Sequence, residues 1–170
     1  KDSDPPRYYN TAAVIQNGRI IATHRKQCLS QSRLMPEDRY FEPGGDELCL
    51  VNVKGFSVAL LTAGDLAGAE PLARAAAVGA DLAVAVAASA YVHGCREQRL
   101  ALLRQRVQET SLPLVYLNQI GGQDELVFDG ASLALDGHAQ LCLQAPAFQT
   151  GSFLLEVQRG NGRCELKSAV

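Results

Sequence analysis

The stretch Leu114-Val115-Tyr116-Leu117-Asn118-Gln119-Ile120-Gly121-Gly122-Gln123-Asp124-Glu125-Leu126-Val127-Phe128-Asp129-Gly130 joins an apolar run to the densest polar segment of the chain. Residues 114–117 predict a strand that is buried on both faces. In α/β folds, ligands bind just beyond the ends of such strands, and paired glycines allow the backbone to turn sharply beside a ligand. The polar segment therefore predicts either a ligand site or a wide Asx/Gly turn, and the pattern alone leaves both open.

The rest of the chain predicts an alternation of hairpins, helices and strands. The expected helices are 71–78 and 96–110, and the expected single strands are 82–88 and 114–117. Hairpins are expected at 11–24, around Asn17-Gly18, and at 48–61 and 126–143. Residues 153–158 predict a final strand and residues 160–170 a tail. This order is typical of an α/β or α+β fold.

Composition bounds the class of protein. The chain has 170 residues, 18 acidic and 16 basic side chains and a net charge of −2, which indicates one globular domain or part of one. Without clustered Lys and Arg, nucleic acid is not expected as a partner. Without a long apolar run, no membrane span is expected. The 5 cysteines have no paired spacing and predict reduced thiols in the cytoplasm.

A few residues could carry chemistry, and each also has a plainer structural interpretation. Lys26 follows the first hairpin, in the long connection 25–47, and long connections are often functional. His24, His93 and His138 are too far apart for metal-ligand spacing, so no metal site is expected. Cys95 precedes a predicted helix, whose dipole can lower the pKa of a thiol, but it is equally a bystander cysteine.

Four segments occur in an order and at distances that match a known family. They are Tyr9-Asn10-Thr11-Ala12-Ala13-Val14, Arg25-Lys26-Gln27-Cys28-Leu29, Arg39-Tyr40-Phe41-Glu42-Pro43-Gly44 and Asn118 to Gly130. From about Tyr8 to Phe148 the chain resembles a carbon–nitrogen hydrolase domain of the nitrilase superfamily. It is most similar to the form found as the glutamine-amidase domain of glutamine-dependent NAD synthetases.

The resemblance implies a nitrilase-like αββα four-layer sandwich and a Glu–Lys–Cys triad. In the family, the Cys thiolate attacks the side-chain amide of glutamine, Glu moves protons, and Lys stabilises the oxyanion. This division of labour fits the general needs of acyl transfer. Lys26 matches the family lysine. No cofactor is implied.

The family's nucleophilic cysteine has no counterpart in this chain. Where the family has Cys-Glu-Asp-Leu-Trp, this chain has Ala63-Gly64-Asp65-Leu66-Ala67. The family segment Asn-Ala-Ser-Pro-Tyr-x-x-Gly-Lys appears as residues 87–95, with Asn, Pro and Lys lost. Several pocket positions have changed together, which indicates divergence rather than one inactivating substitution. The substrate-pocket positions implied by the resemblance are Ala63, Gly64, Asp65, Ala87, Ser89, Tyr91, Gln123, Asp124, Glu125 and Phe128.

The family glutamate lies upstream of the matched region and has no counterpart here. We therefore expect residues 1–150 to be a partial domain whose N-terminal part is missing, followed by a strand and tail at 151–170. A sandwich that lacks part of one sheet exposes apolar surface. This predicts a homo-oligomer, or a companion chain that carries the missing segment. A synthetase domain is a further possible partner.

Three functions remain open on these grounds. The first is a catalytically inactive domain that acts as a structural or regulatory oligomerisation partner. The second is an amidase, supplying ammonia for NAD synthesis, in which a displaced thiol such as Cys95 is the nucleophile. The third is a module that binds a small molecule in the widened pocket.

Overall fold

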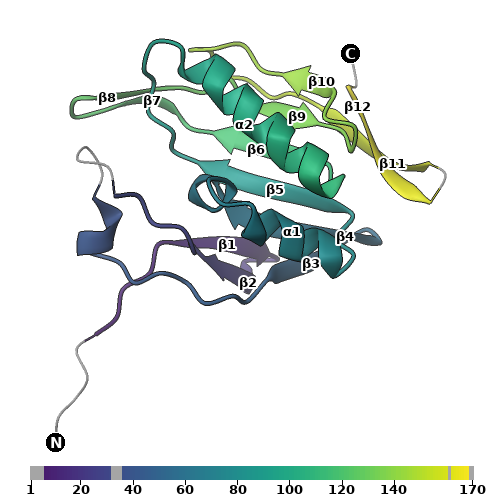
Figure 1. Ribbon diagram of the computed structural model, residues 1–170, viewed down its shortest axis with the longest axis horizontal. Coiled ribbons are helices and arrows are strands. Elements are labelled where there is room, and N and C mark those ends of the chain that lie inside the picture. Colours follow the sequence, from purple (N-terminus) through teal and green to yellow (C-terminus); the bar gives the residue numbers. More distant parts are fainter. Residues whose placement is uncertain (1–5, 32–35, 161, 169–170) are drawn as a thin grey trace, which may run out of the picture.

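The computed structural model describes residues 6–31, 36–160 and 162–168 (Figure 1). Its centre is a six-stranded sheet in the order β10-β9-β6-β5-β4-β3. The strands are β3 (Cys49–Val53), β4 (Phe56–Thr62), β5 (Leu82–Ala87), β6 (Leu114–Asn118), β9 (Leu133–Leu135) and β10 (Leu141–Gln144). β4, β5 and β6 are parallel, and the other pairings are antiparallel. The strands expected at 48–53, 56–61, 82–88 and 114–117 are confirmed, with ends that differ by a residue.

Two helices, α1 (Glu70–Ala77) and α2 (Cys95–Thr110), cover one face of this sheet (Figure 1). α1 has Pro71 in its first turn and Gly79, at φ +81°, just past its end, the usual arrangement of these two residues. The main core lies between the helices and the sheet and includes Leu72, Leu103 and Leu114. Neither helix has the length and hydropathy of a membrane span within the described ranges.

The opposite face of the sheet is partly covered by a hairpin of β11 (Leu155–Gly160) and β12 (Arg163–Ser168). Arg159 fastens this hairpin, because its guanidinium lies 2.9 Å from Asp81 Oδ2 and 2.9 Å from the Gly55 carbonyl oxygen. Beyond the hairpin the face is open. Val86 and Leu117 are cross-strand partners and are 37% and 48% exposed.

Two further hairpins are not hydrogen-bonded into the main sheet. β1 (Thr11–Gln16) pairs with β2 (Arg19–Arg25). Asn17 and Gly18 have positive φ at the turn, as predicted. β7 (Ile120–Gln123) pairs with β8 (Leu126–Asp129) and projects beyond the end of the sheet (Figure 1).

The predicted hairpin at 126–143 is wrong in its first strand. Residues 126–135 form two strands, of which β8 pairs back with β7 and only β9 pairs with β10. The physical reason is at residues 130 and 131, because Gly130 and Ala131 have φ of +65° and +49°. Two residues in the left-handed region cannot continue an extended strand.

The predicted tail at 160–170 is also wrong, since β12 occupies most of it. Gly162, at φ +78°, lies at the turn that leads into this strand. Cys164 and Leu166 then bury their side chains against the sheet. The period of two between them is typical of a strand with one buried face, and this signal is too short to stand out in the sequence.

Candidate functional site

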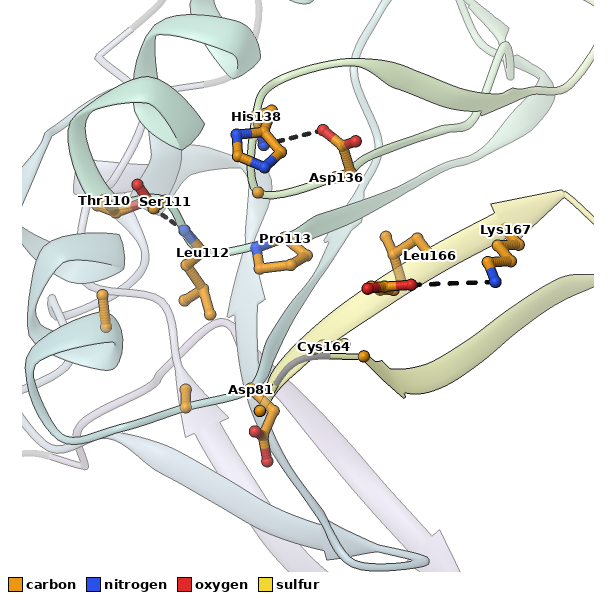
Figure 2. Close-up of a pocket in the computed structure, with 16 residues that line it drawn as sticks. Asp81, Thr110, Ser111, Leu112, Pro113, Asp136, His138, Cys164, Leu166 and Lys167 are labelled. Atoms are coloured by element: carbon orange, nitrogen blue, oxygen red, sulfur yellow. Dashed lines mark hydrogen bonds and ion pairs between the residues drawn. The ribbon is translucent and has the colours of Figure 1, made fainter.

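One cavity, of about 850 Å³, lies beside the amino ends of β5 and β6 (Figure 2). Several of its polar groups bond to near neighbours in the sequence. The Asp136 carboxylate accepts a hydrogen bond from the backbone N–H of His138 at 2.9 Å, and Lys167 pairs with Glu165 at 3.9 Å. Parallel sheets bind ligands at their carboxyl ends instead, so the other end of the sheet is the stronger candidate.

A second cavity, of about 690 Å³, lies at the carboxyl ends of β4, β5 and β6. Its wall is formed by the ends of these strands, the first turns of α2, and the loop after β2. The side chains with chemical interest that line it are Lys26, Glu37, Ala63, Ser89, Cys95 and Arg99. The candidate site is built from these groups.

Lys26 is held against a carboxylate in this cavity. Its Nζ lies 2.5 Å from Glu37 Oε2, and the two side chains are only 13% and 16% exposed. Glu37, in the 3-10 helix η1 (Glu37–Arg39), also accepts hydrogen bonds from the Asn10 side chain at 2.7 Å and the Ser30 backbone at 2.8 Å. Burial alone raises the pKa of Glu37, but the Lys26, Ser30 and Asn10 donors outweigh it and lower that pKa below its ordinary value. Glu37 is therefore a carboxylate that keeps Lys26 in place.

Ala63 begins the 3-10 helix η2 (Ala63–Leu66), immediately after β4. Next to it, Gly64 lies under the lysine, because a β-carbon on residue 64 would stand 3.0 Å from Lys26 Nζ and closer still to Lys26 Cε. Lys26 thus extends over the turn that carries Ala63. The cavity brings together a fixed cation, Lys26, and a carboxylate, Glu37. At the turn between β4 and η2 it has only the methyl side chain of Ala63.

Asp65 is the third residue of this turn, and its side chain is fully buried. Its carboxylate accepts hydrogen bonds from the His24 ring, Thr62 and the backbone after Lys26. Burial raises the pKa of Asp65, but these donors, His24 first, lower it to about 2.

Arg99 and Asp129 form a buried ion pair at the other side of the cavity. Arg99 Nη2 lies 2.9 Å from Asp129 Oδ1, and the side chains are 8% and 0% exposed. Cys95, the first residue of α2, has its Sγ 3.8 Å from the same guanidinium. Cys95 is therefore the thiol that shares the cavity with Lys26.

The structure brings together five of the eleven predicted site residues. Lys26, Ala63, Gly64, Ala87 and Ser89 line the cavity. Six other predicted residues are not among the described residues that line this cavity, namely Asp65, Tyr91, Gln123, Asp124, Glu125 and Phe128. Their predicted role as pocket residues stays a prediction.

The remaining predicted residues lie at two other places. Gln123, Asp124 and Glu125 are exposed at the tip of the β7–β8 hairpin. Tyr91 packs edge-on against Phe148, with ring centroids 5.2 Å apart, while Phe128 is buried.

Two functional candidates were missed by the sequence reasoning. Glu37 stands just before the Arg39-Tyr40-Phe41-Glu42-Pro43-Gly44 segment, so its place beside a distinctive motif was the available signal. Arg99 lies on the helix expected at 96–110, and its ion pair with Asp129 allows this charged side chain to be buried. No group of three metal-ligating side chains occurs among the residues that the structure describes.

Comparison with known sequences identifies the family. The sequence profile of the carbon-nitrogen hydrolases matches residues 1–163. A glutamine-dependent NAD(+) synthetase of Xanthomonas campestris pv. campestris is 46% identical over 142 residues, which are 82% of this chain and 26% of that protein. The corresponding synthetase of Xylella fastidiosa is 41% identical over 157 residues, 91% of this chain and 29% of that protein. The chain thus spans less than a third of these relatives.

Solved structures agree with the sequence comparison. A glutamine-dependent NAD+ synthetase from Acinetobacter baumannii superimposes with a TM-score of 0.87 at 27% identity, over 95% of this chain and 30% of that one. An amidase of the nitrilase superfamily from Nesterenkonia superimposes with a TM-score of 0.70 at 28% identity, over 80% of this chain and 50% of that one. A variant of that amidase carries an acetamide moiety added covalently at its active-site cysteine.

These matches confirm the predicted fold, which is nitrilase-like. The described residues supply one helical layer and one sheet of the expected sandwich, with the β11–β12 hairpin on the second face of that sheet. The helical layer, the sheet and the lysine-bearing cavity at its carboxyl end lie within the matched region. The chain belongs to the carbon-nitrogen hydrolase family.

Proposed function

We propose that this chain is a catalytically inactive glutamine-amidase-like domain of the NAD synthetase type, which acts as a structural or regulatory partner in an assembly. The observation that carries the proposal is Ala63, at the start of the turn after β4, in the cavity that holds Lys26 and Glu37. Hydrolysis of an amide by the family route begins with a nucleophile at this position, and a methyl group has no electron pair to donate.

The other groups of the cavity do not substitute for the nucleophile in this proposal. Lys26 is paired with the Glu37 carboxylate, and a lysine ammonium has no free electron pair with which to attack a carbonyl carbon. The same pair could still bind the polar end of an amide or acid. The cavity is therefore suited to bind a ligand without converting it to a product.

The role as a partner is supported by the open face of the sheet. Val86 and Leu117 expose apolar side chains where a second sheet would pack in a sandwich. The match covers only 50% of the Nesterenkonia amidase. That amidase therefore has about as many residues outside the matched region as inside it. We propose that a companion segment or a second copy covers this face, and that a synthetase domain is the wider partner.

The proposed setting is the cytoplasm. All 5 cysteines are free thiols, and reduced thiols are typical of that compartment. The synthetases to which the chain is similar use glutamine, according to their names, so glutamine is the substrate to test.

The decisive experiment measures ammonia release from glutamine by the purified chain, alone and with its co-purifying partners. The Xanthomonas campestris synthetase serves as the positive control. We expect no release above the uncatalysed rate from the chain alone. Release at an enzyme-like rate would contradict the proposal.

One observation favours a second candidate, an amidase with a displaced nucleophile. Cys95 lines the same cavity as Lys26. It lies at the first turn of a helix, and its Sγ is 3.8 Å from the Arg99 guanidinium, so the cavity holds a thiol beside a cation. If the chain releases ammonia, Cys95→Ser decides between the candidates. Loss of release assigns the chemistry to Cys95, and unchanged release excludes it.

The cavity itself favours a third candidate, a small-molecule binding module. A volume of about 690 Å³ lies within the range of known ligand pockets. Thermal-shift titration with glutamine, glutamate and precursors of NAD tests this role. No shift at millimolar ligand would exclude it.

A further inference from the structure

The Asp65 carboxylate is a buried group that the chemistry of the cavity does not use directly. Asp65 is 0% exposed and is the third residue of the turn that begins at Ala63. A buried carboxylate is costly unless hydrogen bonds replace its lost water. The donors that stabilise this one are therefore informative about its role.

Five donors converge on the two oxygens. Oδ1 accepts from the backbone N–H groups of Gln27, at 2.7 Å, and Cys28, at 3.1 Å. Oδ2 accepts from the Thr62 backbone at 2.9 Å, from the Thr62 hydroxyl at 2.7 Å and from His24 Nε2 at 2.7 Å. One side chain thus gathers donors from three separate segments of the chain.

These donors flank the two positions that matter in the cavity. His24 precedes Lys26 by two residues, while Gln27 and Cys28 directly follow it. Thr62 directly precedes Ala63. The carboxylate therefore ties the His24 side chain before the lysine, and the backbone after it, to the end of β4.

The backbone of Lys26 itself is fixed by two more hydrogen bonds. Its N–H donates to the Asn10 carbonyl oxygen at 2.8 Å, and its carbonyl oxygen accepts from the Gly44 N–H at 2.7 Å. These bonds hold the lysine loop, residues 26–28, to Asn10 on one side and to Gly44 on the other. The bonds to Asp65 connect that loop to the turn after β4.

We propose that Asp65 is the positioning residue of Lys26, holding its ammonium over residues 63 and 64 and against Glu37. The inference concerns the cavity of the proposed function and rests on it for the importance of Lys26. It does not depend on whether the cavity is catalytic. The hydrogen bonds of Asp65 thus orient the Lys26 ammonium even though the same turn carries Ala63.

An uncharged analogue of the same shape separates this role from simple packing. Asn at position 65 presents one acceptor oxygen and one NH₂ group, which donates. The NH₂ group must then face a backbone N–H on one of the two sides, either Gln27 and Cys28 or Thr62. That backbone N–H is left without an acceptor. We expect the lysine loop to separate from the turn.

The test compares the acetylation of individual lysines under an amine-reactive reagent, followed by peptide mass spectrometry. Lys54, exposed in the turn between β3 and β4, is the internal reference. We expect Asp65→Asn to raise the ratio of Lys26 to Lys54 acetylation about tenfold, as the loop opens locally. Asp136→Asn is the matched control, because Asp136 also accepts backbone N–H groups, from His138 and Gln140, but at the other end of the sheet. That variant should leave the ratio unchanged.

A second readout distinguishes positioning from a general loss of stability. The carboxyl carbon signal of Glu37, followed by NMR against pH, reports on its contact with Lys26. In Asp65→Asn the pKa of Glu37 should rise toward its ordinary value, because the Lys26 donor that lowers it has moved. A folded variant in which neither the acetylation ratio nor the Glu37 titration changes would overturn the proposal.

Thr62→Val keeps the proposal testable if Asp65→Asn does not fold. It removes only the hydroxyl donor to Asp65, and we expect a rise of about twofold in the acetylation ratio. An unchanged ratio in folded Thr62→Val would then overturn the inference. Ammonia release tests the proposed function separately, since neither lysine readout depends on turnover.

Discussion

The side chain of Lys26 lies in the space that a β-carbon on Gly64 would need. That β-carbon would stand 3.0 Å from Lys26 Nζ and would also meet Lys26 Cε and the Cys28 carbonyl oxygen. The position of the lysine in this chain therefore requires the absence of a side chain at residue 64. The sequence resemblance implies Glu at the matching family position, and a side chain there would not fit beside Lys26 in its present course.

Substitution of Gly64 by Ala should displace the lysine. We expect Gly64→Ala to lower the free energy of unfolding by about 1–3 kcal/mol, the usual cost of overpacking, and to raise the acetylation of Lys26. Urea unfolding and peptide mapping measure the two effects. Gly45→Ala is the matched control, because a β-carbon there would meet no atom within 4 Å. An equal cost in both variants would contradict the steric explanation.

Substitution of Ala63 by Cys should give a reactive thiol. The ammonium of Lys26 lies over the same turn, and a nearby cation favours the thiolate form. We expect Ala63→Cys to be alkylated by iodoacetamide at the introduced thiol at least tenfold faster than Cys49 and Cys164, whose thiol pKa values are raised by burial. Mass spectrometry of the peptides gives the rates.

The control for this prediction is the same substitution without the cation. Ala63→Cys combined with Lys26→Gln should lose most of the rate advantage. If the introduced thiol reacts equally fast in both proteins, Lys26 does not act on that position.

The pKa of Asp65 predicts a dependence of stability on pH. Its folded pKa of about 2 lies below the ordinary value of 3.8, so the unfolded chain binds the proton more readily. The stabilisation is therefore complete above about pH 4 and is lost as the pH falls toward 2, with a total of ~2 kcal/mol. The measurement is urea unfolding from pH 5 to pH 2, and the difference between the native chain and Asp65→Asn isolates this group. A difference that stays constant over the range would refute the assignment.

The regular elements of the fold were predictable because their signals are local. Alternation and turn residues located β1, β2, β3 and β4, while the Pro71 start and Gly79 stop located α1. The pairing of β8 was not predictable in this way. It depends on the left-handed backbone at Gly130 and Ala131, and Ala at such a position has no signature in the sequence.

The site was only partly predictable for the same physical reason. Lys26 and Ala63 could be placed from motifs, and both line the cavity. The Glu37 partner and the Asp65 network depend on side chains that meet across 11 to 41 positions of sequence. Periodicity does not report such contacts. The folded structure was needed to find them.

The ion pair of Arg99 and Asp129 predicts a large loss of stability when it is broken. Asp129→Asn leaves the Arg99 cation buried with a weaker partner, and we expect a cost of about 3 kcal/mol or more in urea unfolding. Glu70→Gln is the control, because Glu70 pairs with Arg74 while 86% exposed. Its expected cost is below about 0.5 kcal/mol. Comparable costs for the two variants would show that burial of the pair is not decisive.

The open face of the sheet predicts where the chain associates. Leu117 is 48% exposed beside Val86, and contiguous exposed apolar surface on a sheet marks an interaction site. We expect Leu117→Gln to raise the dissociation constant for self-association or partner binding at least tenfold, about 1.4 kcal/mol. Its effect on unfolding should be within about 0.5 kcal/mol. Sedimentation velocity gives the first quantity and urea unfolding the second. Val127→Gln is the matched control, since Val127 is 49% exposed but belongs to the β7–β8 hairpin. If Val127→Gln weakens association as much as Leu117→Gln does, the interface lies elsewhere than on this face.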